Sequence, residues 1–206
     1  MNFPIPVFFV SSIIFVALLA YKRSRQSRNQ ANANSSFLER ERIANNTRKQ
    51  DISGLDYLPF SMDRLPVSAG GSKELISLET TLKELAGQRI INLSEYSNTD
   101  LKMMYGPANL TALSEYDDNY HNLAKTLFAY ADCLAKNGRT DDAAAVLEYA
   151  MELCIQFSQI YLLLAQLYRK QHTPEKINSI RDALSKMDEP FGSYVLSKLD
   201  DSAEES

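Results

Sequence analysis

Residues 124–153 read AKTLFAYADCLAKNGRTDDAAAVLEYAMEL, and this stretch decides the fold. It begins with apolar residues at spacings of three and four, the pattern of a helix with one buried face: Leu127, Tyr130, Ala131 and Leu134. Because glycine adopts the left-handed cap conformation without a Cβ clash, Gly138 predicts the end of that helix. Thr140 is a candidate cap for a second helix, whose predicted buried stripe is Ala143, Val146, Leu147 and Ala150.

The same plan recurs 34 residues later. The second copy has its own stripe and a break at 171–173, and then a further apolar set. The two sets are Tyr161, Leu164, Ala165 and Tyr168, followed by Ile177, Ile180 and Leu184. A 34-residue period with two helices per unit resembles the tetratricopeptide repeat. The resemblance covers about 124–189, with repeats at about 124–157 and 158–189; the alternative is a four-helix bundle with accidental periodicity.

Some positions depart from the family pattern. Ala131 and Ala165 supply the small residue expected at the closest helix crossing of each first helix. In the second helix, however, Ile177 and Leu184 replace the small residues of the first copy, which implies looser or differently angled packing. Arg181 stands where the family usually has a large aromatic residue, which places this helix near the solvated end of the array.

Further helices are expected on both sides of the repeats, within a helical domain spanning 72–199. Ser72 is a candidate cap for a helix from Lys73 to Ala86, and helical patterns follow after Ser97 and from Asn109. Since about three repeat units are usually needed for a stable stack, these helices would supply the missing N-terminal layer. A capping helix is predicted at 190–199 and an acidic tail at 200–206. The predicted fold class is therefore all-α: a short α-solenoid of tetratricopeptide-like antiparallel hairpins.

The N-terminal segment 1–21 has no charged side chain, and its apolar part is Val7–Ala20. As a helix the segment would span about 30 Å, enough to cross a bilayer core. A cleaved signal would need positive charge before the apolar run; the basic residues instead follow it, as Lys22, Arg23, Arg25 and Arg28. The positive-inside rule then predicts a single-pass signal anchor with the N-terminus outside and the helical domain cytoplasmic. A cleaved signal and an interfacial helix remain alternatives.

Two different segments connect the predicted anchor to the helices. Residues 22–50 are basic and polar, a composition typical of a solvated juxtamembrane stalk whose charges can contact anionic lipid. Residues 51–71 are rich in apolar side chains, but Pro59 and Pro66 forbid a continuous helix. We expect an extended strap lying on the helical domain. The alternative is a docking motif offered to another protein.

Charge and composition weigh against several functional classes. Residues 1–50 carry eight basic and two acidic side chains, a net charge of +6, whereas the remainder carries 14 and 24, a net charge of −10. An acidic helical domain is a poor nucleic-acid partner. His121 and His172 have no metal-ligand spacing to Cys or acidic residues, and no nucleophile elbow or nucleotide-binding loop is present. The sequence predicts no enzyme, no cofactor and no small-molecule substrate.

The resemblance implies a function in protein binding. In tetratricopeptide arrays the first helices of successive repeats line a groove that holds a peptide. In the matching register the groove positions here are Lys125, Phe128, Asp132, Leu162, Gln166 and Arg169. The apolar Phe128 and Leu162 and the acidic Asp132 disfavour the carboxylate clamp of some family members and favour a mixed peptide with an apolar anchor. The alternative is a structural or assembly subunit of a membrane complex that uses the outer helical surface.

Overall fold

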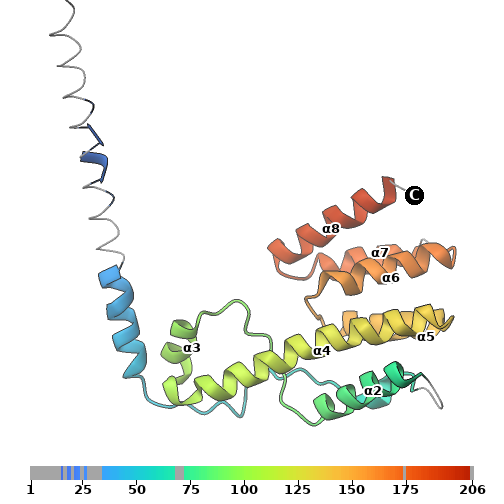
Figure 1. Cartoon of the computed structure of the whole chain (residues 1–206), viewed down its shortest axis with the longest axis horizontal. Helices are drawn as coiled ribbons and strands as arrows, with labels where there is room; N and C mark the ends of the chain where they lie inside the picture. The colour runs from blue at the N-terminus through green and yellow to red at the C-terminus, as the bar shows by residue number, and fades with distance from the viewer. Residues whose placement is uncertain are drawn as a thin grey trace, which may run out of the picture. The chain divides into compact units, whose positions relative to one another are not determined.

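The computed structural model describes residues 34–67, 72–173 and 175–204, together with 15, 18, 19, 21–23 and 26. Within these residues the regular structure is helical and contains no strand, which confirms the all-α class (Figure 1). The predicted transmembrane segment 1–21 lies outside the described residues, apart from four positions. Across the described part of the chain, no helix combines the length and the apolar character needed to cross a membrane.

The chain divides into two compact units. The first comprises Met1–Ile52 and Tyr96–Leu110, and the second comprises Ser53–Glu95 and Thr111–Ser206. In the first unit, a helix at 34–45 is accompanied by α3 (Asn98–Tyr105) and the 3-10 turn η2 (Pro107–Asn109). The start of α3 is a capping box, in which Ser97 and Asp100 each bond the other's backbone. The helix expected after Ser97 is therefore present, with Ser97 as its cap.

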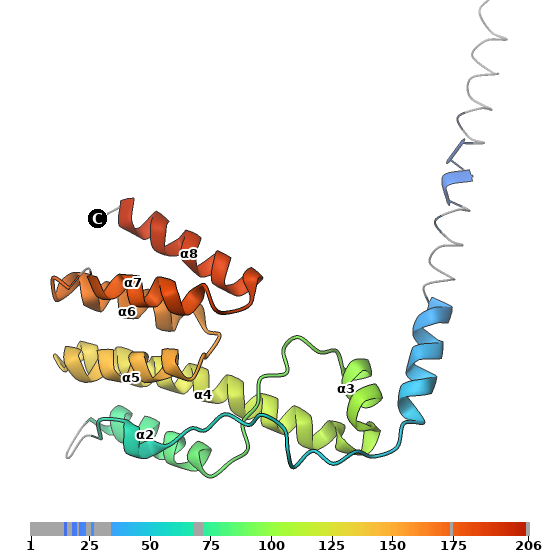
Figure 2. The same ribbon diagram turned by 180° about the vertical axis from the view of Figure 1, so that it is seen from behind.

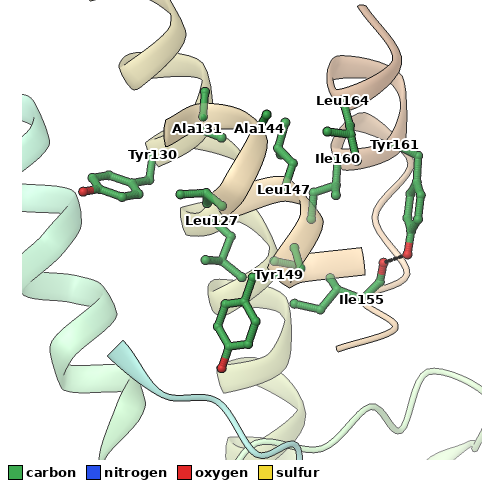
Figure 3. Close-up of a cluster of buried hydrophobic side chains, with 14 of the residues drawn as sticks. Leu127, Tyr130, Ala131, Ala144, Leu147, Tyr149, Ile155, Ile160, Tyr161 and Leu164 are labelled. Carbon is green, nitrogen blue, oxygen red and sulfur yellow. Dashed lines mark hydrogen bonds between the residues drawn. The ribbon is translucent and has the colours of Figure 1, made fainter. Parts of the chain in front are cut away.

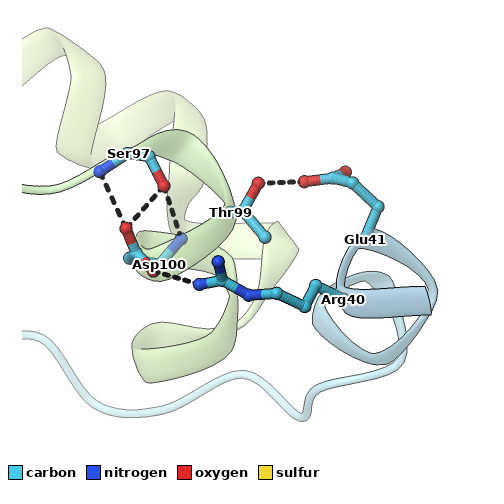
Figure 4. Close-up of polar contacts among 5 residues, drawn as sticks. All are labelled: Arg40, Glu41, Ser97, Thr99 and Asp100. Carbon is cyan, nitrogen blue, oxygen red and sulfur yellow. Dashed lines mark hydrogen bonds and ion pairs between the residues drawn. The ribbon is translucent and has the colours of Figure 1, made fainter. Parts of the chain in front are cut away.

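Polar contacts join α3 to the 34–45 helix (Figure 4). The Glu41 carboxylate accepts hydrogen bonds from the Thr99 hydroxyl and, at 2.9 Å, from the Lys102 ammonium. Arg40 pairs with Asp100 at 2.9 Å. Part of the segment predicted as a solvated stalk is thus a helix with ordered partners in its own unit.

The second unit is a stack of helices (Figures 1 and 2). Its elements are η1 (Met62–Arg64), α2 (Lys73–Ala86), α4 (Leu110–Lys136), α5 (Thr140–Glu152), α6 (Ser158–Lys170), α7 (Glu175–Leu184) and α8 (Glu189–Glu204). Both views show α2 on one side of the α4–α5 pair, the α6–α7 pair on the other side, and α8 beyond it. The helix predicted from Lys73 to Ala86 is confirmed, with Ser72 as its cap. The C-terminal helix is longer than predicted, since it includes part of the expected acidic tail.

One buried stripe repeats along the stack. Leu127 on α4, Tyr161 on α6 and Val195 on α8 follow each other at 34-residue intervals, and all three are fully buried. A second set at the same interval, Ala131, Ala165 and Leu199, is also buried. Figure 3 shows Leu127 and Ala131 of α4 facing Ala144 and Leu147 of α5, with Ile160, Tyr161 and Leu164 of α6 beyond them. The 34-residue period of the sequence is therefore a period of packing that extends into α8.

Helices α4, α5 and α6 end in the same hydrogen-bonded motif. Gly138 (φ +79°), Cys154 (φ +54°) and His172 (φ +54°) occupy the left-handed position after the helix. At each end the residue that follows the left-handed one donates its backbone amide to the carbonyl five residues before it, as Arg139 does to Leu134 at 3.0 Å. The predicted helix end at Gly138 is confirmed. The predicted cap at Thr140 is wrong: α5 begins at Thr140, and the preceding Arg139 makes no side-chain cap bond.

The strap lies on the helices of its own unit through its described residues. The Leu58 amide donates to the Ile90 carbonyl at 2.8 Å, and the Ser61 amide donates to the Tyr149 hydroxyl at 2.9 Å. Phe60 is buried and stacks on the Tyr149 ring, with centroids 6.1 Å apart. Residues 58–61 of the predicted strap thus lie on the helical domain, as expected.

Candidate partner-binding surfaces

Two of the predicted groove residues are apolar and partly accessible. Phe128 of α4 and Leu162 of α6 are half-buried and pack against the core. The Phe128 ring meets the Phe157 ring edge to face at a centroid distance of 5.8 Å. Because α4 and α6 are the first helices of successive hairpins, this face is the one that the repeat register assigns to a groove. Each of these two side chains is partly accessible to a partner and partly packed against the core.

The polar groove positions differ in how firmly they are held. Lys125 and Gln166 are exposed. The Asp132 carboxylate is half-buried and pairs with Lys136, one turn later on α4, at 2.6 Å. Its negative charge is therefore partly balanced within the helix, and Lys125 and Gln166 are the positions that a partner could reach without breaking a contact.

Arg169 has a structural role that its position in the register did not predict. Its guanidinium donates to the Leu199 carbonyl of α8 at 3.1 Å, and the side chain is half-buried. The next helix of the stack thus engages this end of α6. Among the predicted groove positions, Arg169 is therefore less available to a partner than Lys125 or Gln166.

The strap is bound on a different side of α4. Tyr130 donates from its hydroxyl to the Pro66 carbonyl at 2.6 Å, and Arg64 pairs with Glu152 of α5 at 2.6 Å. At about 100° per residue, Tyr130 projects about 160° around the helix from both Phe128 and Asp132. The strap contacts therefore lie on the opposite side of α4 from the groove face. They leave the groove face open to another occupant.

Buried tyrosine hydroxyls connect the layers and do so as neutral groups. Tyr161 donates to the Ile155 carbonyl at 2.8 Å (Figure 3), and Tyr168 donates to the Glu148 carboxylate at 2.6 Å. Burial raises the pKa of both hydroxyls well above the ordinary value, and Glu148 adds to the effect at Tyr168. A phenol that stays protonated this firmly is a hydrogen-bond donor, so Tyr168 joins α6 to α5 and Tyr161 holds the loop before α6.

A polar cleft between α2 and α4 was not predicted from the sequence. Its volume is about 500 Å³, and its lining is Thr81, Glu84, Leu85, Gln88, Glu115, Asn119, Asn122 and Thr126. The α4 residues recur at spacings of three and four, which is a polar stripe visible in the sequence. Such a stripe usually faces solvent, and only the position of α2 turns this one into the wall of a cleft.

Comparison with known proteins assigns no function to these surfaces. No family model, curated protein or solved structure matches the chain. Within the described residues, no group of three or more His, Cys, Asp or Glu side chains is arranged to hold a metal ion. Cys133 is buried, which raises the pKa of its thiol, while Cys154 is exposed at a helix end.

Proposed function

We propose that the chain is a membrane-anchored, tetratricopeptide-like scaffold that binds a partner protein or peptide on the face shared by α4 and α6. The observation that carries this proposal is the 34-residue recurrence of buried positions through three successive helices, with Leu127, Tyr161 and Val195 as one set. Stacked hairpins of this kind present the same helix of each unit on one surface. That surface here combines half-buried apolar side chains with exposed polar ones.

The chemistry of this face suits a peptide with an apolar anchor. Phe128 and Leu162 offer the apolar contact, and large apolar and aromatic side chains supply most of the binding energy at protein interfaces. Lys125 and Gln166 flank them and would fix the register of the peptide through polar contacts. The outer surface is a poorer candidate, because the strap already covers Tyr149 and pairs with Glu152 on α5.

The membrane part of the proposal rests on where exposed apolar side chains occur. Of the 13 large hydrophobic residues exposed in the described part of the chain, ten belong to the first unit and three to the second. Four of the ten lie in or at the end of the charge-free N-terminal run: Phe15, Leu18, Leu19 and Tyr21. Exposed apolar side chains in such numbers favour contact with lipid or another protein over contact with water.

The test compares crosslinked partners of the wild-type chain with those of two variants, by quantitative mass spectrometry from detergent extracts. Lys125→Glu with Gln166→Glu changes only exposed side chains and should displace the partner without altering the melting temperature. Phe128→Ala with Leu162→Ala should also displace it, with a modest loss of stability because both side chains touch the core.

The matched control is Ile76→Ala with Tyr194→Ala, which removes two exposed apolar side chains elsewhere in the second unit. This variant should retain the partner. If the Lys125/Gln166 variant keeps every crosslinked partner, the α4–α6 face is not the binding surface.

A further inference from the structure

The cleft between α2 and α4 is rich in hydrogen-bond acceptors. Its lining includes the carboxylates Glu84 and Glu115, three side-chain amides and two hydroxyls, and only Leu85 is apolar. It includes no lysine, arginine or histidine. Both hydroxyls donate within their own helices, Thr81 to the Ser77 carbonyl at 3.2 Å and Thr126 to the Asn122 carbonyl at 2.7 Å, so the oxygens they turn outward are acceptors.

The two carboxylates of the cleft are not engaged by any described cation of the protein. Neither Glu84 nor Glu115 forms an ion pair with any residue in the described part of the chain. Arg89, one residue beyond the cleft, is held elsewhere: its guanidinium lies 5.3 Å from the Tyr57 ring centroid and 5.8 Å from that of Tyr116. Arg89 is therefore engaged by the two rings, and Lys125, which lies in sequence between the lining residues Asn122 and Thr126, forms no ion pair with Glu84 or Glu115 within the described residues.

The cleft has walls that are fixed by the fold. The Asn119 amide donates to the Arg89 carbonyl at 3.1 Å, and the Ile91 amide donates to the Tyr116 carbonyl at 3.3 Å. These bonds hold residues 89–91, which follow α2, against α4, and the lining residue Leu85 is buried. The backbone that carries the acceptors is thus positioned before any ligand arrives, which lowers part of the entropic cost of binding.

We propose that this cleft binds an arginine-rich segment of a partner protein. A guanidinium group matches a carboxylate with two parallel hydrogen bonds and carries further donors that the amide and hydroxyl oxygens can accept. The charge of the whole region agrees with this occupant, since residues 51–206 carry a net charge of −10. The cleft is separate from the α4–α6 face: on α4, Asn122 and Thr126 project well away from the direction of Phe128.

The probe is a fluorescein-labelled eight-residue arginine–serine peptide, titrated by fluorescence anisotropy against the full chain in a nonionic detergent. The lysine–serine and glutamate–serine peptides are run beside it. We expect the arginine peptide to bind more tightly than the lysine peptide and the glutamate peptide not to bind. Glu84→Gln with Glu115→Gln should weaken arginine-peptide binding about five- to twentyfold, the range for two partly exposed ion pairs.

The charge-matched control is Glu175→Gln with Asp182→Asn on α7, where both side chains are exposed. It should change the affinity less than about twofold. Equal losses in both variants would show general attraction to an acidic protein and overturn the proposal, as would no binding of the arginine peptide to the wild-type chain.

One further variant replaces Lys22, Arg23, Arg25 and Arg28 by glutamine. If this change strengthens peptide binding in a way that Glu84→Gln with Glu115→Gln abolishes, the cleft holds the chain's own basic segment, and the partner proposal is wrong. Unchanged peptide binding supports a partner as the occupant. The Phe128→Ala with Leu162→Ala variant changes no residue of the cleft. Failure of the cleft proposal would therefore leave the groove proposal standing, and failure of the groove proposal in that variant would leave the cleft proposal standing.

Discussion

Gly138 and His172 occupy the same place in the packing period but should respond to substitution in opposite directions. They lie 34 residues apart, and each is the left-handed residue that ends a first helix, with φ of +79° and +54°. A left-handed conformation costs a residue with a Cβ about 1–2 kcal/mol, while glycine gives up about 0.4–1 kcal/mol through the entropy of the unfolded chain. The difference predicts that Gly138→Ala destabilises by about 0.5–1.5 kcal/mol and that His172→Gly stabilises by about 0.5 kcal/mol or slightly more.

The environment of Gly138 makes the experiment a test of backbone conformation alone. A Cβ added there would meet no atom within 4 Å, so no steric clash contributes. The assay is thermal unfolding followed by circular dichroism on the chain from Asn34 onward. For a domain of this size 1 kcal/mol corresponds to about 2–4 °C, so the two variants should shift the melting temperature by a few degrees in opposite directions.

Gly54 provides the control for this pair. A Cβ added at Gly54 would also meet no atom within 4 Å, but the backbone there lies outside the left-handed region, so Gly54→Ala should be neutral or slightly stabilising. If Gly138→Ala behaves like Gly54→Ala, or if His172→Gly lowers the melting temperature, the left-handed conformation does not control stability at these two corresponding helix ends, and the reasoning is wrong.

Two other predictions concern the first unit and the membrane. Hydrogen bonds from Thr99 and Lys102 hold the pKa of Glu41 below its ordinary value of 4.5, so this carboxylate contributes stability above that pH and loses the contribution as the pH falls through its lowered pKa. Amide NMR signals of α3 should therefore broaden or shift on acidification from pH 4.5, and Glu41→Gln should remove much of that dependence; an unchanged pH response in the variant contradicts the assignment. For the proposed anchor, protease added to intact cells should leave the helical stack whole, and a mature N-terminus near Tyr21 or digestion of the stack would refute this topology.

Much of the stack could be predicted because its signals are local. The helix from Lys73 to Ala86 follows from a cap, an apolar spacing and a terminal glycine, all within one window of sequence. The end at Gly138 follows from the conformational freedom of one residue. Cys154 and His172 adopt the same left-handed conformation without that freedom. The break at 171–173 could still be predicted, because it lies 34 residues after the first one, whereas no residue type indicated the end at Cys154.

The candidate sites were harder to predict because each depends on a second helix. Register alone placed Arg169 in a groove, but α8 supplies a backbone carbonyl that engages it. A polar stripe on α4 was visible in the sequence, at Glu115, Asn119, Asn122 and Thr126. Because α2 lies beside it in the structure, the stripe lines a cleft instead of an open helix face. Long-range packing decides whether a polar stripe is a solvated surface or a binding cleft.

The two outer helices of the stack help to indicate where a partner can bind. A repeat array must cover the apolar face of its last helix with polar side chains to remain soluble. On α8 the buried positions Val195 and Leu199 face the stack, while Ser193, Ser197 and Lys198 are exposed and Tyr194 is a single exposed aromatic. On α2 the exposed positions are likewise mostly polar, with Ile76 the exception. Neither outer face offers a continuous apolar surface for another hairpin, so we infer that partners bind along the sides of the stack, where the α4–α6 face and the α2–α4 cleft lie.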